Sequence, residues 1–320
     1  MRIRLADYVA DFLVSHGVTD VFSVVGGGAM HLNDAFGHQE GLKITYNHHE
    51  QACTIAAEGY TRQTGKIAPV CVTGGPGGTN AITGVFGAYV DSIPMFVVTG
   101  QAKRETTVWS TNLPLRQLGD QEVNITSAVS TMTKYAKMIT DPMSIRKEVE
   151  KAWFLMLNGR PGPVWLDIPG DVASTFIETD DLEGFDKQGY IDEHWASFNQ
   201  DNPVYDEQYT KDVLAKIKEA KRPVILAGTA IRHAGQQSEF IKCIDKLGIP
   251  VVTAWDAHDI IWDEHPLYCG RPGTVGTRAG NFIVQNADLL IVLGCRMNIR
   301  MIGYNFGDFG KNAYKIVVDI

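Results

Sequence analysis

The stretch Asn47-His48-His49-Glu50-Gln51-Ala52-Cys53 ends an apolar run at residues 42–46 and opens a predicted helix that extends to Arg62. Its spacing alone favours a capping box, in which Asn47 caps the helix and Glu50 reaches back to the backbone N–H of the cap. The residues after Glu50 are small and apolar nearly all round, which predicts a helix that is buried on more than one side. A carboxyl group that enters such a place is desolvated, as in sites that exchange protons. Glu50 is therefore our first candidate catalytic residue, and the capping box is the alternative.

Two glycine-rich turns follow predicted strands. Gly74-Gly75-Pro76-Gly77-Gly78-Thr79-Asn80 comes after an apolar run at 67–73, and Gly26-Gly27-Gly28 comes after a strand at 21–25. A strand, a glycine turn and a helix N-terminus together bring backbone N–H groups close to a ligand. Each turn is explained equally simply as a tight strand-to-helix connection.

Apolar runs and helical patterns alternate through the first 170 residues, which predicts a parallel sheet with helices on both faces. The predicted helices are 5–16, 48–64, 78–90 and 142–158, and the predicted strands are 21–25, 42–46, 67–73, 94–99, 133–139 and 164–169. Ligands of such sheets lie beyond the carboxyl ends of the strands, so Gly26, Glu50 and Gly75 should share one edge.

A second series of strands and helices begins at residue 207, after an acidic and aperiodic segment that predicts a surface linker at 173–206. Its predicted helices are 207–220, 235–247 and 278–286, and its predicted strands are 223–228, 250–253, 288–294 and 315–318. We therefore predict an α/β protein with two doubly wound parallel-sheet domains, at 1–172 and 207–320.

Composition narrows the class of protein. The 320 residues are 44% hydrophobic and carry a formal net charge of −8, which argues against nucleic acid or an anionic membrane as a partner. No stretch is long and apolar enough to span a bilayer, and the N-terminus leads into an amphipathic helix instead of a signal peptide. The five cysteines are scattered and read as buried reduced thiols. We expect a cytoplasmic protein with neither a disulfide framework nor a zinc site.

Several motifs, taken in order and spacing, resemble the N-terminal pyrimidine-binding domain of thiamine-diphosphate enzymes, and the acetolactate synthase-like group above all. The resemblance covers at least the first 170 residues. It is carried by His49-Glu50-Gln51-Ala52, Ala57-Glu58-Gly59-Tyr60-Thr61-Arg62, Gly75-Pro76-Gly77-Gly78-Thr79-Asn80, Asp91-Ser92-Ile93-Pro94 and Gly100-Gln101.

The resemblance implies roles for these residues. Glu50 would hold the N1′ atom of the cofactor's aminopyrimidine and favour the tautomer that removes the thiazolium C2 proton. Gln121, in a Gln-Glu pair, would reach the reaction chamber, although Asp120 replaces the usual phenylalanine and a solvated polar loop is the alternative. The substrate would be a 2-keto acid such as pyruvate, and the protein a homodimer or homotetramer with active sites between chains. The residues implied in cofactor binding are Gly26, Gly27, Gly28, Glu50, Gly75, Pro76, Gly77 and Asn80.

The second domain resembles the Rossmann-like central domain of the same family, which binds FAD in acetolactate synthases. The family's two acids after Gly294 are missing here, so a purely structural domain is the alternative. The fingerprint G-x-G-x-x-G is also absent, which disfavours a hydride-transferring dehydrogenase. The candidate FAD residues are Gly228, Thr229, Ala230, Thr253, Gly273, Gly294 and Arg296.

Family members continue into a third domain that holds Mg²⁺ and the cofactor's diphosphate, and we find no clustered acids here that would replace it. We therefore expect the N-terminal portion of a longer lyase or carboligase that is inactive alone and has no metal site of its own. One alternative is a non-catalytic dimerisation or regulatory module of the same fold. The other is a flavin- or nucleotide-binding protein that uses residues 207–320.

Overall fold

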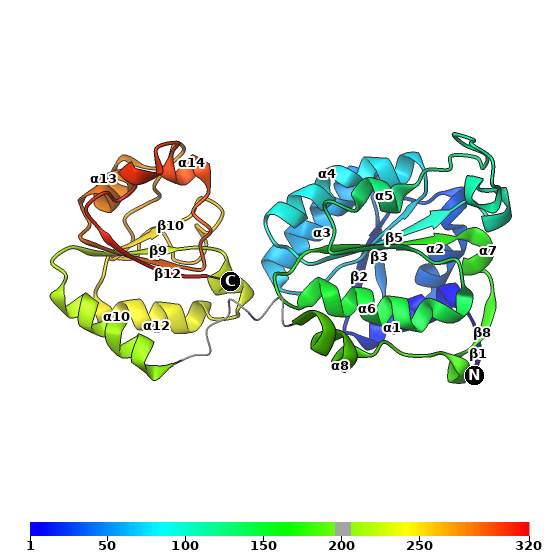
Figure 1. Cartoon of the computed structure of the whole chain (residues 1–320), viewed down its shortest axis with the longest axis horizontal. Helices are drawn as coiled ribbons and strands as arrows, with labels where there is room; N and C mark the ends of the chain where they lie inside the picture. Colours follow the sequence, from blue (N-terminus) through cyan, green and yellow to red (C-terminus); the bar gives the residue numbers. More distant parts are fainter. Residues whose placement is uncertain (196–205, 320) are drawn as a thin grey trace. The chain divides into compact units, whose positions relative to one another are not determined.

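The structure, a computed structural model, describes residues 1–195 and 206–319. The chain divides into two compact units, residues 1–198 and 199–320, each with its own sheet (Figure 1). Both sheets are parallel and lie between helices, which confirms the predicted fold class. Part of the predicted linker, at 196–205, lies outside the described residues.

The first unit is built around a six-stranded parallel sheet in the order β3-β2-β4-β5-β7-β6. The interior strands β5 and β7 are buried along their whole length, which is why they read as continuous apolar runs. The chain passes from β2 to β3 on one side and from β4 to β5 on the other, so the carboxyl ends of β2 and β4 form a topological switch point. The strands are β2 (Asp20–Ser23), β3 (Lys43–Tyr46), β4 (Val70–Thr73), β5 (Met95–Gln101), β6 (Tyr135–Met138) and β7 (Pro163–Pro169).

Helices cover both faces of this sheet (Figure 1). One face shares a core with α1 (Leu5–Ser15), α2 (Met30–His38), α6 (Ile145–Leu157) and α7 (Gly170–Ala173). The other face shares a core with α3 (Glu50–Thr64), α4 (Pro76–Val90) and α5 (Ile125–Val129). Short 3₁₀ turns complete the unit at η1 (Gly27–Ala29), η2 (Arg104–Thr106), η3 (Val108–Ser110), η4 (Pro142–Ser144) and η5 (Thr179–Asp181).

The chain after β7 stays on the first unit beyond residue 172. The short strand β8 (Phe176–Glu178) pairs antiparallel with β1 (Arg2–Arg4). Then α8 (Lys187–Tyr190) and the π-helical turn η6 (Ile191–Trp195) follow, and the ring of Tyr190 lies 6.2 Å from that of Phe154. These elements lie inside the segment that the sequence predicts to be a linker. The sequence does not reveal them, because a three-residue strand and a one-turn helix are too short to show periodicity.

The second unit has a four-stranded parallel sheet in the order β10-β9-β11-β12. Helices α10 and α12 lie on one face, and α13 and α14 lie on the other (Figure 1). Its strands are β9 (Pro223–Ala227), β10 (Val251–Thr253), β11 (Leu289–Leu293) and β12 (Tyr314–Val318). Its helical elements are α10 (Glu207–Glu219), α11 (Ala230–His233), α12 (Gln237–Leu247), α13 (Arg278–Asn286), α14 (Ile299–Ile302) and η7 (Phe306–Asp308).

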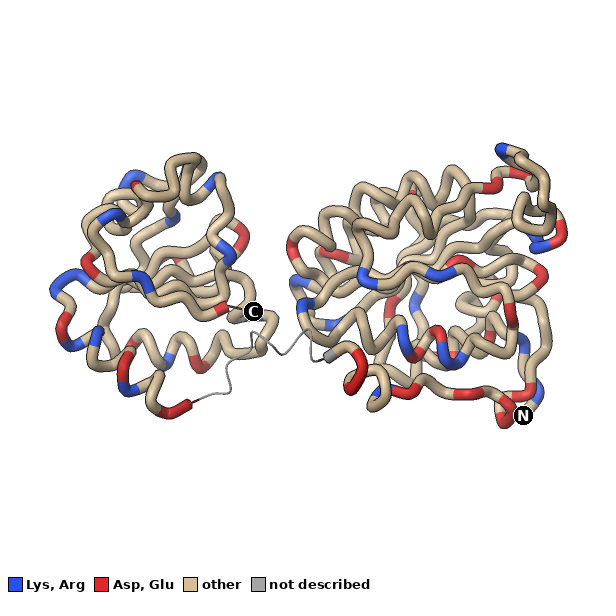
Figure 2. Tube along the Cα trace, viewed as in Figure 1, with Lys and Arg blue, Asp and Glu red and all other residues tan. Residues whose placement is uncertain are grey.

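Charges and thiols are spread over both units. Acidic and basic residues are interspersed along each trace (Figure 2). Within the described ranges, no helix combines the length and apolar character that crossing a membrane requires. Cys53, Cys71 and Cys295 are buried as expected, whereas Cys243 is exposed because it lies on the outer side of α12.

Helices α3 and α4 approach each other closely at Gly84. A Cβ atom at this position would lie 2.3 Å from Oγ1 of Thr54 and 3.0 Å from the backbone nitrogen of Ile55. The hydroxyl of Thr54 also donates to the backbone oxygen of Ala81, at 3.2 Å, and so joins the two helices directly. The contact therefore needs a glycine on α4.

We expect Gly84→Ala to lower the free energy of unfolding by about 1–3 kcal/mol, because the added methyl group overfills the α3–α4 contact. Gly87→Ala is the matched control on the same helix, since its nearest neighbour would be Oε2 of Glu58 at 3.4 Å. There, the higher helix propensity of alanine should raise stability by up to about 1 kcal/mol. Urea denaturation measures both values, and two equally stable variants would contradict the argument.

Candidate functional site

Two segments converge on Thr73, the last residue of β4. The backbone N–H of Gly28 donates to Oγ1 of Thr73 at 3.1 Å. A Cβ atom at Gly26 would lie 2.5 Å from Cβ of Thr73, and one at Gly77 would lie 2.8 Å from its Cγ2. The turn after β2 and the start of α4 are thus pressed against one threonine at the switch point, where a ligand of this sheet would lie.

The turn after β4 is filled from the other side by Gln121. Gly75 has φ +60°, a conformation that L side chains rarely adopt, and a Cβ atom there would lie 2.1 Å from the backbone oxygen of Gln121. Gln121 itself has φ +57° and is exposed. Its close approach to Gly75 means that the predicted catalytic glutamine lies beside the glycine turn. Pro76 is the first residue of α4 and is exposed. The site position of Gly27 is more open, because a Cβ atom there would meet nothing within 4 Å.

Glu50 is the first residue of α3 and is partly buried. Its Oε2 accepts a hydrogen bond from Nδ2 of Asn80 at 3.0 Å. Its Oε1 lies 3.3 Å from where a Cβ atom of Gly77 would stand. The start of a helix favours an anionic side chain through the N–H groups of the first turn. The carboxylate is therefore held at one oxygen, and the glycine leaves space beside the other.

The capping box, which was the alternative role for Asn47 and Glu50, is wrong. The N-cap of α3 is His49, whose Nδ1 accepts from the backbone N–H of Gln51 at 3.1 Å. Asn47 has its backbone N–H bound to the oxygen of Ser23, at 2.9 Å, because the chain is still extending the sheet there. The carboxyl group of Glu50 is thus released from a capping role.

The expectation that α3 is buried on more than one side is confirmed, because the helix packs on both the sheet and α4. Cys53, Thr54 and Ala57 face the sheet and α4, but the side chain of Ile55 is 49% exposed. The apolar outer face of α3 is uncovered here because no second element of this chain packs on it in the described residues.

A buried carboxyl group lies near this edge, at Asp167 of β7. It is 0% exposed and accepts hydrogen bonds from Oγ1 of Thr99 at 2.7 Å and from Nε2 of Gln101 at 3.0 Å. Burial raises the pKa of Asp167 to about 6, against the lowering effect of these two hydrogen bonds. Gln101 also donates to the backbone oxygen of Val123 at 2.9 Å, which connects Asp167 to the end of the loop that carries Gln121.

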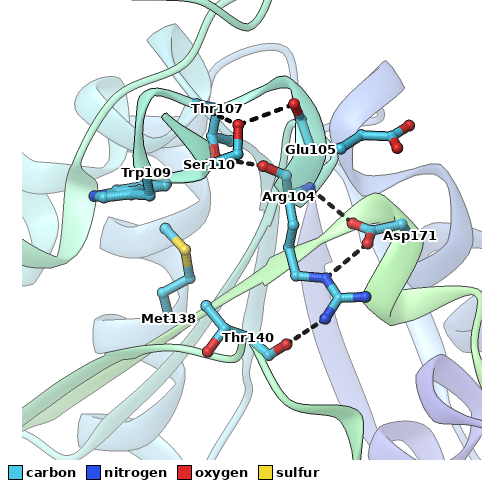
Figure 3. A pocket seen from close by; sticks show the side chains of 8 residues that line it. All are labelled: Arg104, Glu105, Thr107, Trp109, Ser110, Met138, Thr140 and Asp171. Carbon is cyan, nitrogen blue, oxygen red and sulfur yellow. Dashed lines mark hydrogen bonds and ion pairs between the residues drawn. The ribbon is translucent and has the colours of Figure 1, made fainter. Parts of the chain in front are cut away.

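A pocket of about 410 Å³ lies elsewhere, between η2, η3, β6 and α7 (Figure 3). Arg104 donates from Nε to Oδ2 of Asp171 at 2.7 Å and from Nη1 to the backbone oxygen of Thr140 at 2.6 Å. The side chains of Trp109 and Met138 line the opposite wall. Because Asp171 already pairs with Arg104, this guanidinium is poorly placed to take an anionic substrate. The pocket lining does not include Glu50, Gln121 or the glycine turns.

Most of the candidate FAD residues lie at the carboxyl ends of β9, β10 and β11 in the second unit, and Gly273 lies in the loop between β10 and α13. The N–H of Gly228 donates to the oxygen of Leu293 at 2.9 Å, and the N–H of Ala230 donates to the oxygen of Gly294 at 3.2 Å. A Cβ atom at Gly228 would lie 2.1 Å from the oxygen of Gly294. These glycines bring two strand ends together, and their amides are already used within the protein.

The remaining candidate FAD residues have different surroundings. Thr253 is 0% exposed, and its Oγ1 has no hydrogen-bond partner among the described residues; Nε of Arg271 is likewise buried and without a partner among them. Gly273 has its N–H bound to Oδ1 of Asn281 at 2.9 Å. Thr229 is partly buried and Arg296 exposed. Orphaned polar atoms at this edge fit an additional polar ligand, and Thr253 is the predicted residue that needs one most.

Two family models match this chain. Residues 3–128 match the N-terminal TPP binding domain of thiamine pyrophosphate enzymes, and residues 210–320 match the central domain of the same enzymes. The chain therefore belongs to the thiamine pyrophosphate enzyme family, which confirms the resemblance.

Within that family the chain is similar to large subunits of acetolactate synthase. It is 33% identical over 304 residues to the acetolactate synthase large subunit of Lactococcus lactis, a match over 95% of this chain and 50% of that protein. It is 31% identical over 322 residues to the large subunit of acetolactate synthase isozyme 1 of Escherichia coli, over 100% of this chain and 53% of that protein. A probable acetolactate synthase large subunit of Methanococcus aeolicus is 31% identical over 318 residues, covering 98% and 50%. The chain spans about half the length of these curated relatives.

Thr73 is the site residue that sequence reasoning missed. A hydroxyl-bearing β-branched residue between a buried strand and a double glycine was the available signal. Gly100 also belongs to this close approach, since a Cβ atom there would lie 2.1 Å from the backbone oxygen of Gly28.

We expect Gly28→Ala to lower the free energy of unfolding by about 1–3 kcal/mol, because the new methyl group must displace a packed turn. Its Cβ atom would lie 2.8 Å from Oγ1 of Thr73 and 2.9 Å from the backbone oxygen of Gly100. Gly27→Ala is the neighbouring control and should change stability by less than about 0.5 kcal/mol. Thermal and urea unfolding measure the difference, and equal losses in both variants would disprove the close approach.

Asp167 should make stability depend on pH. Its pKa is raised from 3.8 to about 6 in the folded state, so the folded state binds this proton more tightly. Its stabilising contribution is complete below the unfolded pKa and is lost as pH rises through the folded pKa, a change on the order of 3 kcal/mol. Asp167→Asn removes this dependence, so the variant should gain stability relative to the unmodified protein between about pH 4 and pH 7. A stability difference that stays constant over this range would refute the assignment.

Proposed function

We propose that this chain forms the pyrimidine-binding half of a thiamine-diphosphate-dependent lyase or carboligase that acts on a 2-keto acid such as pyruvate. The observation that carries the proposal is the position of Glu50 at the switch point, with one oxygen bound by Asn80 at 3.0 Å and glycine beside the other. Family membership and the similarity to acetolactate synthase large subunits support the same reaction class. The whole enzyme's activity is our inference from this site.

The residues present fit an aminopyrimidine ring. A planar ring needs a wall without side chains, and the turns at Gly26–Gly28 and Gly75–Gly77 supply one around Thr73. It also needs a partner for a ring nitrogen, which is the role of Glu50. Asn80 holds the other carboxylate oxygen and so fixes the direction in which Glu50 points.

When bound, thiamine diphosphate supplies a carbanion at the thiazolium ring and takes up the electrons left by decarboxylation. The contribution of this chain is a proton relay and its surroundings. Glu50 shares a proton with the ring nitrogen N1′, and the neighbouring glycine turns exclude side chains from the ring face. Gln121, whose backbone lies beside Gly75, is the residue we assign to the side where the keto acid would enter. The Mg²⁺ that the resemblance assigns to a further domain stays a prediction.

A second copy of the chain is the partner we propose for the uncovered face of α3 and α4. Ile55 is 49% exposed, Phe86 53% and Tyr89 42%, which is unusual for large apolar residues on two adjacent helices. In the resembling family the active site is completed across such a contact. Sedimentation of the purified protein as a monomer at all concentrations would exclude it.

The FAD site in the second unit is also a proposal. The orphaned hydroxyl of Thr253 and the buried Nε of Arg271 support a polar ligand, whereas the internally bonded amides of Gly228 and Ala230 do not contribute to one. Yellow flavin released on denaturing the purified protein would support it. Flavin without any keto-acid chemistry would instead favour the alternative of a nucleotide-binding protein, and the absence of both would favour a dimerisation module.

A cytoplasmic location also stays a prediction.

We expect Glu50→Gln to reduce the rate of pyruvate consumption by about 100-fold or more, because an amide does not exchange the proton. The assay uses the longest protein that the gene encodes, with thiamine diphosphate, Mg²⁺ and pyruvate, and measures acetolactate and CO₂. Glu40→Gln is the control, since this acid is exposed and precedes the amino end of β3, at the edge of the sheet opposite the switch point. Unchanged activity in Glu50→Gln would end the proposal.

A further inference from the structure

The loop between β5 and α5 is organised around one carboxylate, that of Glu122. The residue is 9% exposed. Its Oε1 accepts the backbone N–H of Val108 at 2.7 Å, and its Oε2 accepts the N–H groups of Leu118 and Gly119 at 3.0 and 2.9 Å. A carboxylate that accepts three backbone N–H groups makes strong, charge-assisted hydrogen bonds. Glu122 thus joins the outgoing half of the loop, at η3, to its returning half.

The same loop is anchored at its base by Gln101. Its Oε1 accepts the N–H of Ala102 at 3.0 Å, and its Nε2 donates to the backbone oxygen of Val123 at 2.9 Å. Both ends of the loop are therefore fixed to β5. What remains to be fixed is the returning segment, which Glu122 holds.

Gln121 precedes Glu122 directly and stands in a strained position. Its φ of +57° is uncommon for a residue with a side chain and is sterically unfavourable. Its Cβ lies 2.9 Å from where a Cβ atom of Gly75 would stand, so a small shift of the segment changes its contact with the glycine turn. A strained residue keeps such a conformation only when its surroundings enforce it. The three hydrogen bonds of Glu122 are the enforcing contacts.

We propose that Glu122 is a positioning residue that holds Gln121, through its backbone and Cβ atom, against the Gly75 turn. Its role in catalysis rests on the function proposed above, whereas its role in ordering the loop stands on the hydrogen bonds alone. Glu122 touches neither substrate nor cofactor and acts through Gln121.

The test compares three variants in the same loop. Glu122→Gln replaces one acceptor oxygen by an amide donor, which opposes the backbone N–H groups. Val108→Pro keeps the carboxylate and deletes a single donor at the first position of η3, where proline is tolerated. Glu105→Gln is the matched control, because it makes the same change of charge at an exposed residue of η2.

The first readout is independent of activity. Amide hydrogen exchange at Leu118 and Gly119 should accelerate by about tenfold or more in Glu122→Gln, as expected for the loss of a hydrogen bond to a charged group. The NMR signals of the Gly75 backbone amide and the Gln121 side-chain amide should shift in Glu122→Gln and Val108→Pro, but not in Glu105→Gln. Unchanged exchange and unchanged signals in Glu122→Gln overturn the proposal, whether or not the protein is active. If Glu122→Gln does not fold, the Gly75 and Gln121 signals in Val108→Pro decide.

The second readout is a double-mutant cycle with Gln121→Ala in the active protein. If Glu122 acts through Gln121, Glu122→Gln lowers kcat in the unmodified background and has little further effect once Gln121 is alanine. Additive losses overturn the positioning role. A protein without any keto-acid activity would refute the proposed function instead, and the exchange and NMR readouts would still judge Glu122.

Discussion

The structure of the site depends on how closely backbone segments approach one another at the switch point of the first sheet. Atoms of a side chain at Gly26, Gly75 or Gly100 would stand within 2.1–2.5 Å of neighbouring heavy atoms. The strands β2, β4 and β5 are adjacent, so the turns at their carboxyl ends must share the same small volume. Only residues without a Cβ atom allow this, and Thr73 fills what space remains. The result is a wall of bare backbone beside a single carboxylate.

The point at which the sheet ends and α3 begins determines where the Glu50 carboxyl group lies. The sheet extends through Asn47, whose N–H is bound by Ser23, and α3 begins only at Glu50 under the cap of His49. Its carboxyl group is consequently directed towards α4 and meets Asn80. If α3 began three residues earlier, Glu50 would be available for an ordinary capping role at the start of the helix.

Much of this arrangement could be predicted from the sequence. Long buried runs such as β7 give strands, because burial on both faces leaves a continuous apolar signal, and glycine turns after such strands predict a shared edge. The cap of α3 could not be predicted, because it depends on where the neighbouring strand stops supplying hydrogen bonds. The partners of Glu122 could not either, since Val108 and Leu118 meet it only through the path of an irregular loop. β8 and α8 were missed because three residues of strand and four of helix are too few to repeat a pattern.

The order of strands in the first sheet also affects how the protein is made. β7 lies between β5 and β6 in the sheet, yet it is the last of the three to leave the ribosome. Until it arrives, β5 exposes an unpaired apolar edge, and all seven of its residues are buried in the finished fold. Such edges recruit strands from other chains during synthesis. The order of the strands therefore leaves the edge of β5 open to pairing between chains until β7 is in place.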